Sequence, residues 1–147
     1  MLIATKFLGD IEIQEQQIIT FEQGLLGLGD IKKFVLLPLE KESPFVILQS
    51  TEQQEIGFVV AYPFVFKKDY IFEISDEDKK DLRVEKEEEL ITYSIVTLKE
   101  PFETSTLNLL APIVINTAKR YGKQVVLPDN KIYPLRYQIT AVEGSAK

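Results

Sequence analysis

Carboxylates are the only side chains in this sequence that could plausibly carry catalysis. The 147 residues contain no cysteine and no histidine, so thiolate nucleophiles, thiolate zinc sites and the commonest general base are absent. Glu12, Glu73 and Asp76 lie in or beside expected strands, and two carboxylates across a cleft can hydrolyse glycosides. Nothing in their spacing pairs them. The sequence therefore favours a protein without catalysis, with a small carboxylate-dependent hydrolase or carbohydrate-binding β-barrel as the alternative.

Acidic residues are also concentrated between Ser75 and Glu89. The Asp-x-Asp-x-Asp-Gly spacing of an EF-hand loop is absent, so we expect no metal site, and we expect no cofactor. The segment SDEDKKDL, residues 75–82, starts with an N-cap serine, continues with acids and ends with lysines, which predicts a short helix. A solvated charged face is its ordinary interpretation, and docking of a basic partner is the functional one.

A small basic cluster, Lys119, Arg120 and Lys123, surrounds Tyr121. Basic side chains beside an aromatic ring can bind single-stranded nucleic acid, but a polar hairpin tip explains the cluster better. The net charge of −6, from 23 acidic and 17 basic side chains, would repel phosphates on average. We therefore expect no direct contact with nucleic acid.

The elements that position these groups are expected to be strands. Hairpins are predicted for residues 2–13, with Gly9 at the turn, and for the apolar segments 34–39 and 44–50. Further strands are expected at 18–21, 56–64, 69–74, 90–98, 124–129 and 132–139. About nine or ten strands against one clear helix is typical of a sandwich or barrel. Most aromatic rings of residues 64–72 should lie in the core, and an exposed one could anchor a partner.

The segment TLNLLAPIVIN, residues 106–116, is an apolar run divided by Pro112. It is too short to cross a bilayer and suits a strand, or two strand halves, buried on both faces. Residues 119–123 should form the turn to its antiparallel partner, 124–129. Asn108 and Asn116 flank the run, and each could hydrogen-bond a partner or serve as a satisfied internal amide.

Composition places the chain among globular proteins of the cytoplasm. The apolar fraction of 45% and the charged fraction of 27% are ordinary, and neither a signal peptide nor a membrane span is visible. We expect a mostly β, small single-domain β-barrel-like fold over residues 1–147, with one or two short helices. Residues 140–147 should be a flexible tail.

Several segments resemble the bacterial flagellar assembly factor FliW family. The similar segments are ITFEQGLLGL at 19–28, FVLLPLEKESPFVILQS at 34–50, SDEDKKDL at 75–82, and NLLAPIVIN at 108–116 followed by GKQVVL at 122–127. They occur in the family's order and span nearly the whole chain.

The resemblance implies a β-barrel-like protein without enzymatic activity that binds two proteins. One is CsrA, a basic RNA-binding translational repressor of flagellin mRNA, whose action FliW proteins block allosterically. The other is flagellin, which captures FliW and so frees CsrA. The contact residues do not follow from the resemblance. We predict Asn108 and Asn116 as partner contacts, because amides at breaks in an apolar run can bond a partner's backbone, with Glu73 and Tyr93 as weaker candidates.

Overall fold

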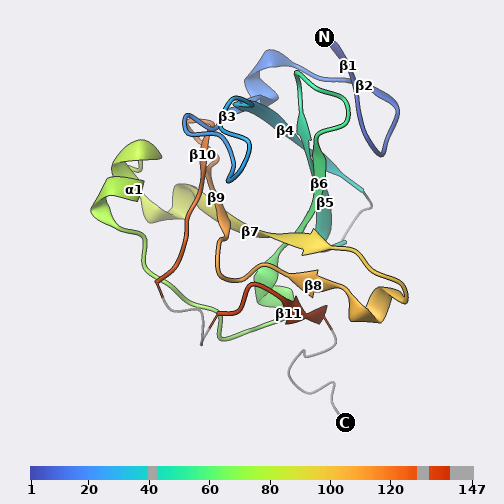
Figure 1. Cartoon of the computed structure of the whole chain (residues 1–147). Helices are drawn as coiled ribbons and strands as arrows, with labels where there is room; N and C mark the ends of the chain where they lie inside the picture. Colours follow the sequence, from blue (N-terminus) through green and yellow to red (C-terminus); the bar gives the residue numbers. More distant parts are fainter. Residues whose placement is uncertain (40–42, 129–132, 140–147) are drawn as a thin grey trace.

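A β-sheet that closes on itself dominates the structure, a computed structural model that describes residues 1–39, 43–128 and 133–139 (Figure 1). Strand β7 pairs with both β6 and β9, so the strand order β7-β6-β5-β4-β3-β10-β9 returns to its start and forms a seven-stranded barrel. Its strands are β3 (Ile19–Thr20), β4 (Lys33–Pro38), β5 (Phe45–Ser50), β6 (Gly57–Ala61), β7 (Leu90–Thr97), β9 (Ile113–Asn116) and β10 (Tyr121–Gln124). The pairings are antiparallel except the β3–β10 pair, which is parallel and joins Thr20 to Tyr121 alone. The expected barrel-like β fold is confirmed.

The barrel strands are apolar on both faces because each face has its own cover. Phe34 and Leu48 belong to one buried cluster, which the loop residues Leu25 and Ile31 complete. Their neighbours along the strands, such as Ile47, face a second cluster built with segments outside the barrel. Successive residues of a strand are therefore buried in different clusters, which explains why the sequences of these strands are apolar at nearly every position.

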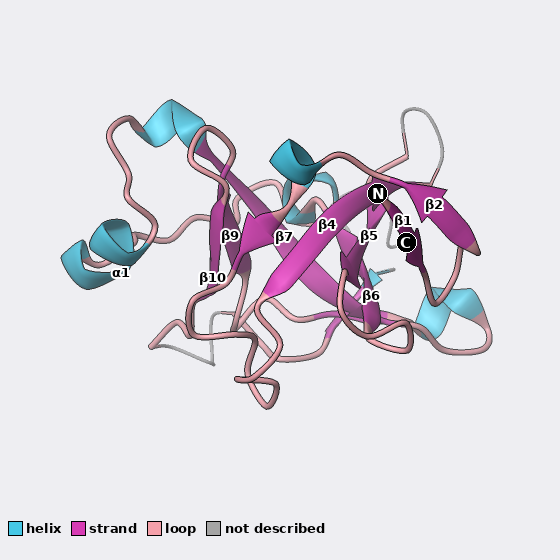
Figure 2. Ribbon diagram, turned by 90° about the horizontal axis from the view of Figure 1, so that it is seen from above, coloured by secondary structure: helices cyan, strands magenta, loops and turns pink. Residues whose placement is uncertain are grey.

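Smaller elements surround the barrel. A separate hairpin of β1 (Leu2–Ala4) and β2 (Asp10–Glu12) lies on one side of the barrel and helix α1 (Asp76–Asp81) on the other (Figure 2). Strands β8 (Thr106–Leu107) and β11 (Tyr137–Gln138) extend the sheet beyond the end of β7. The 3-10 turns are η1 (Glu15–Gln17), η2 (Pro63–Val65), η3 (Glu87–Glu89) and η4 (Phe102–Thr104).

Helix α1 and both hairpins occur where the sequence predicts them. The hydroxyl of Ser75 accepts a hydrogen bond from the backbone N–H of Asp78 at 3.1 Å, which caps α1 as expected. Gly9 has a φ of +71°, which only glycine adopts without strain. The apolar run 106–116 forms two strand halves, β8 and β9, separated by a turn around Pro112.

Two strand predictions are wrong. Residues 69–74 pair with no strand in the described part of the chain, although Tyr70, Phe72 and Ile74 do face the core as expected. The partner of β9 is β10 at 121–124, because the chain already turns at residues 117–120. Val125 and Leu127 still donate to the carbonyls of Pro112 and Leu110 at 2.9 and 2.8 Å, so the pairing continues less regularly. The predicted tail, 140–147, lies outside the described residues.

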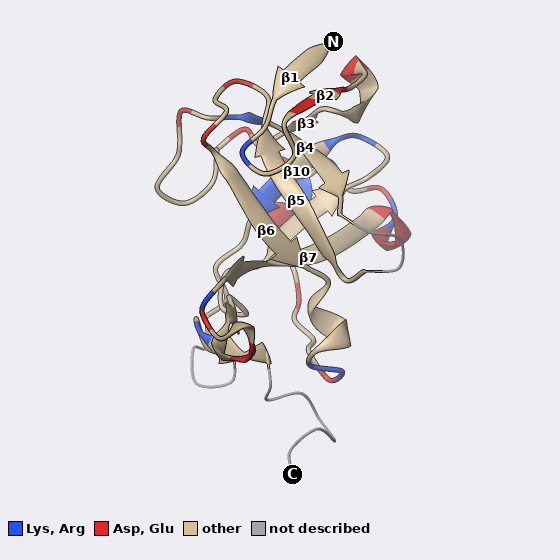
Figure 3. Cartoon of the chain, turned by 90° about the vertical axis from the view of Figure 1, so that its right-hand side faces the viewer, with Lys and Arg blue, Asp and Glu red and all other residues tan. Residues whose placement is uncertain are grey.

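Charge is concentrated in helix α1 and in the loops and turns, and the labelled strands β5, β6 and β7 carry none (Figure 3). In the part of the chain that the structure describes, we find no helix that combines the length and the apolar character needed to span a membrane.

Candidate functional site

Helix α1 is fastened to the barrel by an ion cluster around Lys123 of β10. The Lys123 ammonium lies 2.6 Å from a carboxylate oxygen of Asp78 and 2.6 Å from one of Asp81. Burial would lower the pKa of Lys123, but the hydrogen bonds to both aspartates outweigh it, so the pKa is raised. Two acids of the acidic run are therefore occupied by the protein's own lysine.

The end of α1 is held by a second set of contacts. Arg83 has a φ of +54°, stacks on the Tyr121 ring at 3.8 Å and donates to both carboxylate oxygens of Glu22. The hydrogen bond from Arg83 lowers the pKa of Glu22. The sequence-predicted residue Asn116 is fully buried beneath these groups. Its amide donates to the carbonyls of Leu82 and Arg83 at 2.9 and 3.2 Å.

The basic turn is neutralised in the same way. Lys119 pairs with Glu85 at 2.9 Å, while Tyr121 lies beneath Arg83. The hydrogen bond from Lys119 lowers the pKa of Glu85. The acidic run and the basic turn, which the sequence offers as two separate surfaces, thus contact each other through three ion pairs, from Asp78 and Asp81 to Lys123 and from Glu85 to Lys119. This arrangement fits the interpretation of the turn as a polar hairpin tip.

The segment Tyr70–Ser75 leads into α1 and carries the most exposed large apolar side chain of the described residues, Ile71. Tyr70 is buried, donates to the carbonyl of Leu109 at 2.6 Å and contacts the Phe72 ring, and burial raises its pKa. Ile71 points outward with 74% of its surface exposed. Tyr133 holds Ile71 through its hydroxyl, which accepts from the Ile71 N–H and donates to the Ile71 carbonyl.

A groove lies on each side of this segment, and both include residues 71–75. The first, which we call the acidic groove, has a volume of about 760 Å³. Its other lining residues are Phe64, Tyr70, Asp76, Lys79, Glu87, Leu90 and Thr92. The second, the apolar groove, has a volume of about 600 Å³ and is completed by Asp78, Val125, Val126, Leu127, Pro128 and Tyr133.

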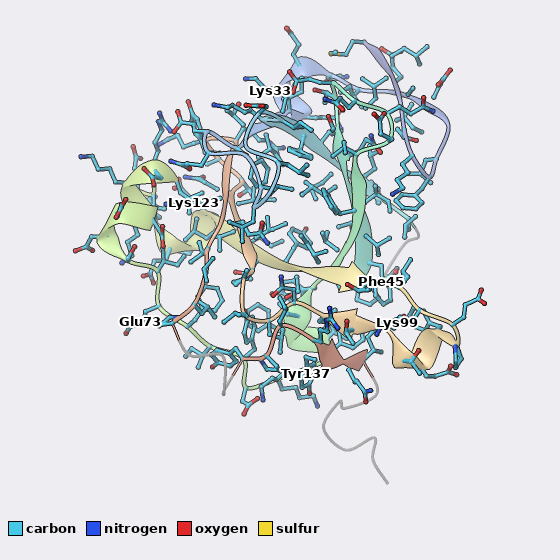
Figure 4. All side chains as sticks on the ribbon, in the orientation of Figure 1. Lys33, Phe45, Glu73, Lys99, Lys123 and Tyr137 are labelled. Carbon is cyan, nitrogen blue, oxygen red and sulfur yellow. The ribbon has the colours of Figure 1, made fainter. Side chains whose placement is uncertain are left out.

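Glu73 projects between these grooves, on the same side of the molecule as Lys123 (Figure 4). Its side chain is exposed, and it makes no hydrogen bond or ion pair with any described residue. A charged group without an internal partner is free to bind an external one.

The other two predicted residues lie elsewhere. Asn108 accepts a hydrogen bond from the Ala111 N–H at 2.9 Å and so closes the turn between β8 and β9. Tyr93 is half-buried in a shallow surface pocket with Pro44, Tyr62 and Val65. Burial, and then the proximity of Tyr62, raise the pKa of Tyr93. The four predicted residues therefore do not form one site.

The sequence singles out Asp76 and Lys123 for other roles, and it does not predict Ile71 as a site residue. Ile71 and Asp76 flank Glu73 along the groove, and Lys123 fixes the helix beside it. The alternation of apolar residues in 70–74 pointed to the segment, but it predicted a paired strand. The exposed Ile71 between two inward-facing aromatic residues was the available clue.

The three carboxylates that the sequence offers for catalysis do not lie in one place, because Glu73 and Asp76 line the acidic groove and Glu12 does not. Glu12 pairs with the terminal amine at 2.8 Å on hairpin β1–β2, on the opposite side of the barrel from Glu73 (Figures 1 and 4). Across residues 1–39, 43–128 and 133–139, no three acidic side chains lie close enough together to hold a metal ion.

Comparison with known proteins gives a consistent result. Residues 2–139 match the FliW protein family. The chain is 50% identical over 147 residues to the flagellar assembly factor FliW of an Exiguobacterium species, which covers 100% of both chains. It is 44% identical over 130 residues to that of Bacillus subtilis, covering 88% of this chain and 91% of the relative. A crystal structure of the flagellar assembly factor FliW superposes with a TM-score of 0.88 at 42% identity, covering 95% of this chain and 96% of the other.

Proposed function

The chain belongs to the FliW family of non-enzymatic flagellar assembly factors, and from this premise we propose that it regulates flagellin synthesis by binding CsrA and flagellin in turn. The observation that carries the proposal is the match to FliW proteins along the full length of the chain. The hydrolase and carbohydrate-binding alternatives have no comparable support.

The proposed mechanism is partner switching in the cytoplasm. When flagellin is scarce, the protein is free to bind CsrA, and CsrA no longer represses flagellin mRNA. Newly made flagellin captures the protein, so CsrA is released and represses again. The protein acts on CsrA allosterically and does not itself bind RNA or a membrane.

The distribution of charge supports CsrA as a partner. The chain carries a net charge of −6, and CsrA is basic, so the two attract each other at long range. Because Asp78, Asp81 and Glu85 are neutralised internally, the attraction must come from other acids. Glu73 lines both grooves and has no side-chain partner among the described residues, and we propose it as the direct contact among the four predicted residues.

The remaining predicted residues have different proposed roles. Asn116 is buried, so it influences a partner only by holding α1 and the end of β9 in place. Asn108 shapes the turn after β8, and Tyr93 lies in a separate pocket that suits a second contact.

A competition titration tests the proposal. Purified protein is first bound to CsrA, and flagellin is then added while the free CsrA is measured by its binding to flagellin mRNA. We expect stepwise release of CsrA as flagellin is added. If neither protein binds, or if flagellin joins the complex without releasing CsrA, partner switching is wrong for this chain.

A further inference from the structure

The backbone of Phe72, Glu73 and Ile74 is distinctive because the described part of the chain offers it no hydrogen-bond partner. Within the described residues, no hydrogen bond reaches the N–H or C=O of these three residues, although the segment has the alternating burial of a β-strand. Backbone groups of an exposed extended segment are a template for strand addition by another chain. The residues on both sides of these three do have hydrogen-bond partners. The Ile71 N–H donates to the Tyr133 hydroxyl, and the Ser75 carbonyl accepts from the Lys79 N–H.

The direction of the free groups follows from the contacts of Ile71. Its N–H and C=O both meet Tyr133, which lines the apolar groove and not the acidic groove. Neighbouring residues of an extended chain direct their backbone groups to opposite sides. The groups of Phe72 and Ile74 therefore point toward the acidic groove, where they offer two donors and two acceptors.

The charges of the acidic groove define the chemistry of what fits there. Glu73, Asp76 and Glu87 supply three carboxylates, against the single ammonium of Lys79. That ammonium is already 3.9 Å from Glu87. Phe64 and Leu90 provide an apolar wall. A strand with basic side chains and alternate apolar ones matches both features.

We propose that a basic partner adds an extended segment to Phe72–Ile74 as a β-strand that lies in the acidic groove. This inference rests on the proposed function, which supplies CsrA as the basic partner. The backbone pairing fixes the register, while Glu73 and Asp76 attract the basic side chains.

Amide hydrogen exchange tests the pairing directly. The exchange of the Phe72 and Ile74 amides is measured by NMR in the free protein and in its complex with purified CsrA. We expect both amides to slow by about tenfold or more in the complex, because each becomes a hydrogen-bond donor to the partner. A complex in which both amides exchange as in the free protein overturns strand addition.

A charge reversal tests the groove. Glu73→Lys changes an exposed side chain with no described partner, so the protein should fold normally. We expect CsrA affinity to fall roughly three- to tenfold, mainly through slower association at low salt. The matched control, Glu103→Lys, makes the same charge change on the exposed turn η4 and should leave affinity nearly unchanged.

The results separate this inference from the proposed function. If the wild-type protein binds CsrA but Glu73→Lys and Glu103→Lys weaken binding equally, the partner docks elsewhere and only this inference is wrong. If Glu73→Lys alone weakens binding without protection of the two amides, the partner uses the groove by side-chain contacts and strand addition is wrong. Absence of any complex with CsrA overturns the proposed function and this inference together.

Discussion

Asn116 uses all of its hydrogen-bonding capacity inside the molecule. Its amide nitrogen donates to Leu82 and Arg83, and its oxygen accepts from the N–H groups of Ala118 and Lys119 at 3.0 and 3.1 Å. One buried side chain thus ties the end of α1 to the turn between β9 and β10. Asn116 therefore affects the candidate site by fixing the position of α1, and it does not contact a partner itself.

The variant Asn116→Ala should be clearly less stable than the wild type. Removing the amide leaves buried backbone groups without partners, which costs roughly 2–4 kcal/mol. Asn108→Ala is the matched control, because Asn108 is half-buried and its side chain makes one described hydrogen bond, to Ala111; we expect a loss of about 1 kcal/mol. Urea unfolding measures both. Equal losses of stability in the two variants would contradict the structural role assigned to Asn116. If both variants bind CsrA with unchanged affinity, neither asparagine contributes to partner binding.

Lys123→Met should destabilise the protein by roughly 1–3 kcal/mol at neutral pH, between the values for exposed and buried ion pairs. The side chain of Lys123 is only 17% exposed, so the variant leaves Asp78 and Asp81 facing each other without a counter-charge. The difference in the free energy of unfolding between wild type and variant measures this contribution.

The pH dependence of that difference has a defined sign. The folded-state pKa of Lys123 is raised above its ordinary value of 10.5, so its contribution is fully present at lower pH. It is lost as the pH rises above 10.5 through the folded-state pKa. A difference that already declines between pH 7 and pH 9 would show that the Lys123 ion cluster is not its source.

At the scale of elements, strand β10 can approach the core closely because Gly122 has no side chain. A β-carbon added at Gly122 would lie 2.4 Å from Cζ of the buried Phe21 ring. The ring therefore occupies the space above the strand and packs edge-on against Phe34 at 5.3 Å between ring centres. This packing holds β3 and β10 beside each other at the one parallel pairing of the barrel strands.

Gly122→Ala should therefore cost about 1–3 kcal/mol by overpacking. Gly29→Ala is the control, because the nearest atom to its added β-carbon is the Gln23 carbonyl oxygen at 3.8 Å, an ordinary contact. We expect that control to change stability by less than about 0.5 kcal/mol. Thermal unfolding of the two variants measures the contrast, and a similar melting temperature for both would contradict the close approach of Phe21.

Local patterns predicted the elements better than their pairing. The N-cap at Ser75 and the alternation of residues 70–74 are properties of neighbouring residues, so they are visible in the sequence. Whether 70–74 finds a strand partner depends on segments distant along the chain. The same limit applies to the acidic run, since its pairing with Lys119 and Lys123 depends on a contact more than 30 residues away along the chain.

At the scale of the whole molecule, the barrel and the N-terminal hairpin differ in how they are held. Each barrel strand is paired with a neighbour on both sides, so detaching one strand breaks the hydrogen bonds of two strand pairs. Hairpin β1–β2 has three residue pairs and no further strand beside it in the described chain. Its attachment to the barrel includes core packing by Ile3 and Ile13, with Leu8 and Ile11 partly buried against the same cluster. Two hydrogen bonds add to it, from the Lys6 N–H to Gln49 at 3.0 Å and from the Gln54 side chain to the Thr5 carbonyl at 3.4 Å.

The hairpin should consequently open without unfolding the barrel. In native-state hydrogen exchange, we expect the amides of Thr5 and Ile13, which bond to Gly9 and Met1, to exchange by a local opening that depends weakly on denaturant. Barrel amides such as those of Ile47 and Leu48 should exchange only by global unfolding, because β5 is paired with both β4 and β6. Equal opening free energies for Thr5 and Leu48 would mean that hairpin and barrel form one cooperative unit. In that case the closed ring is not the boundary of the stable core, and Ile3 and Ile13 contribute to it as fully as the barrel strands do.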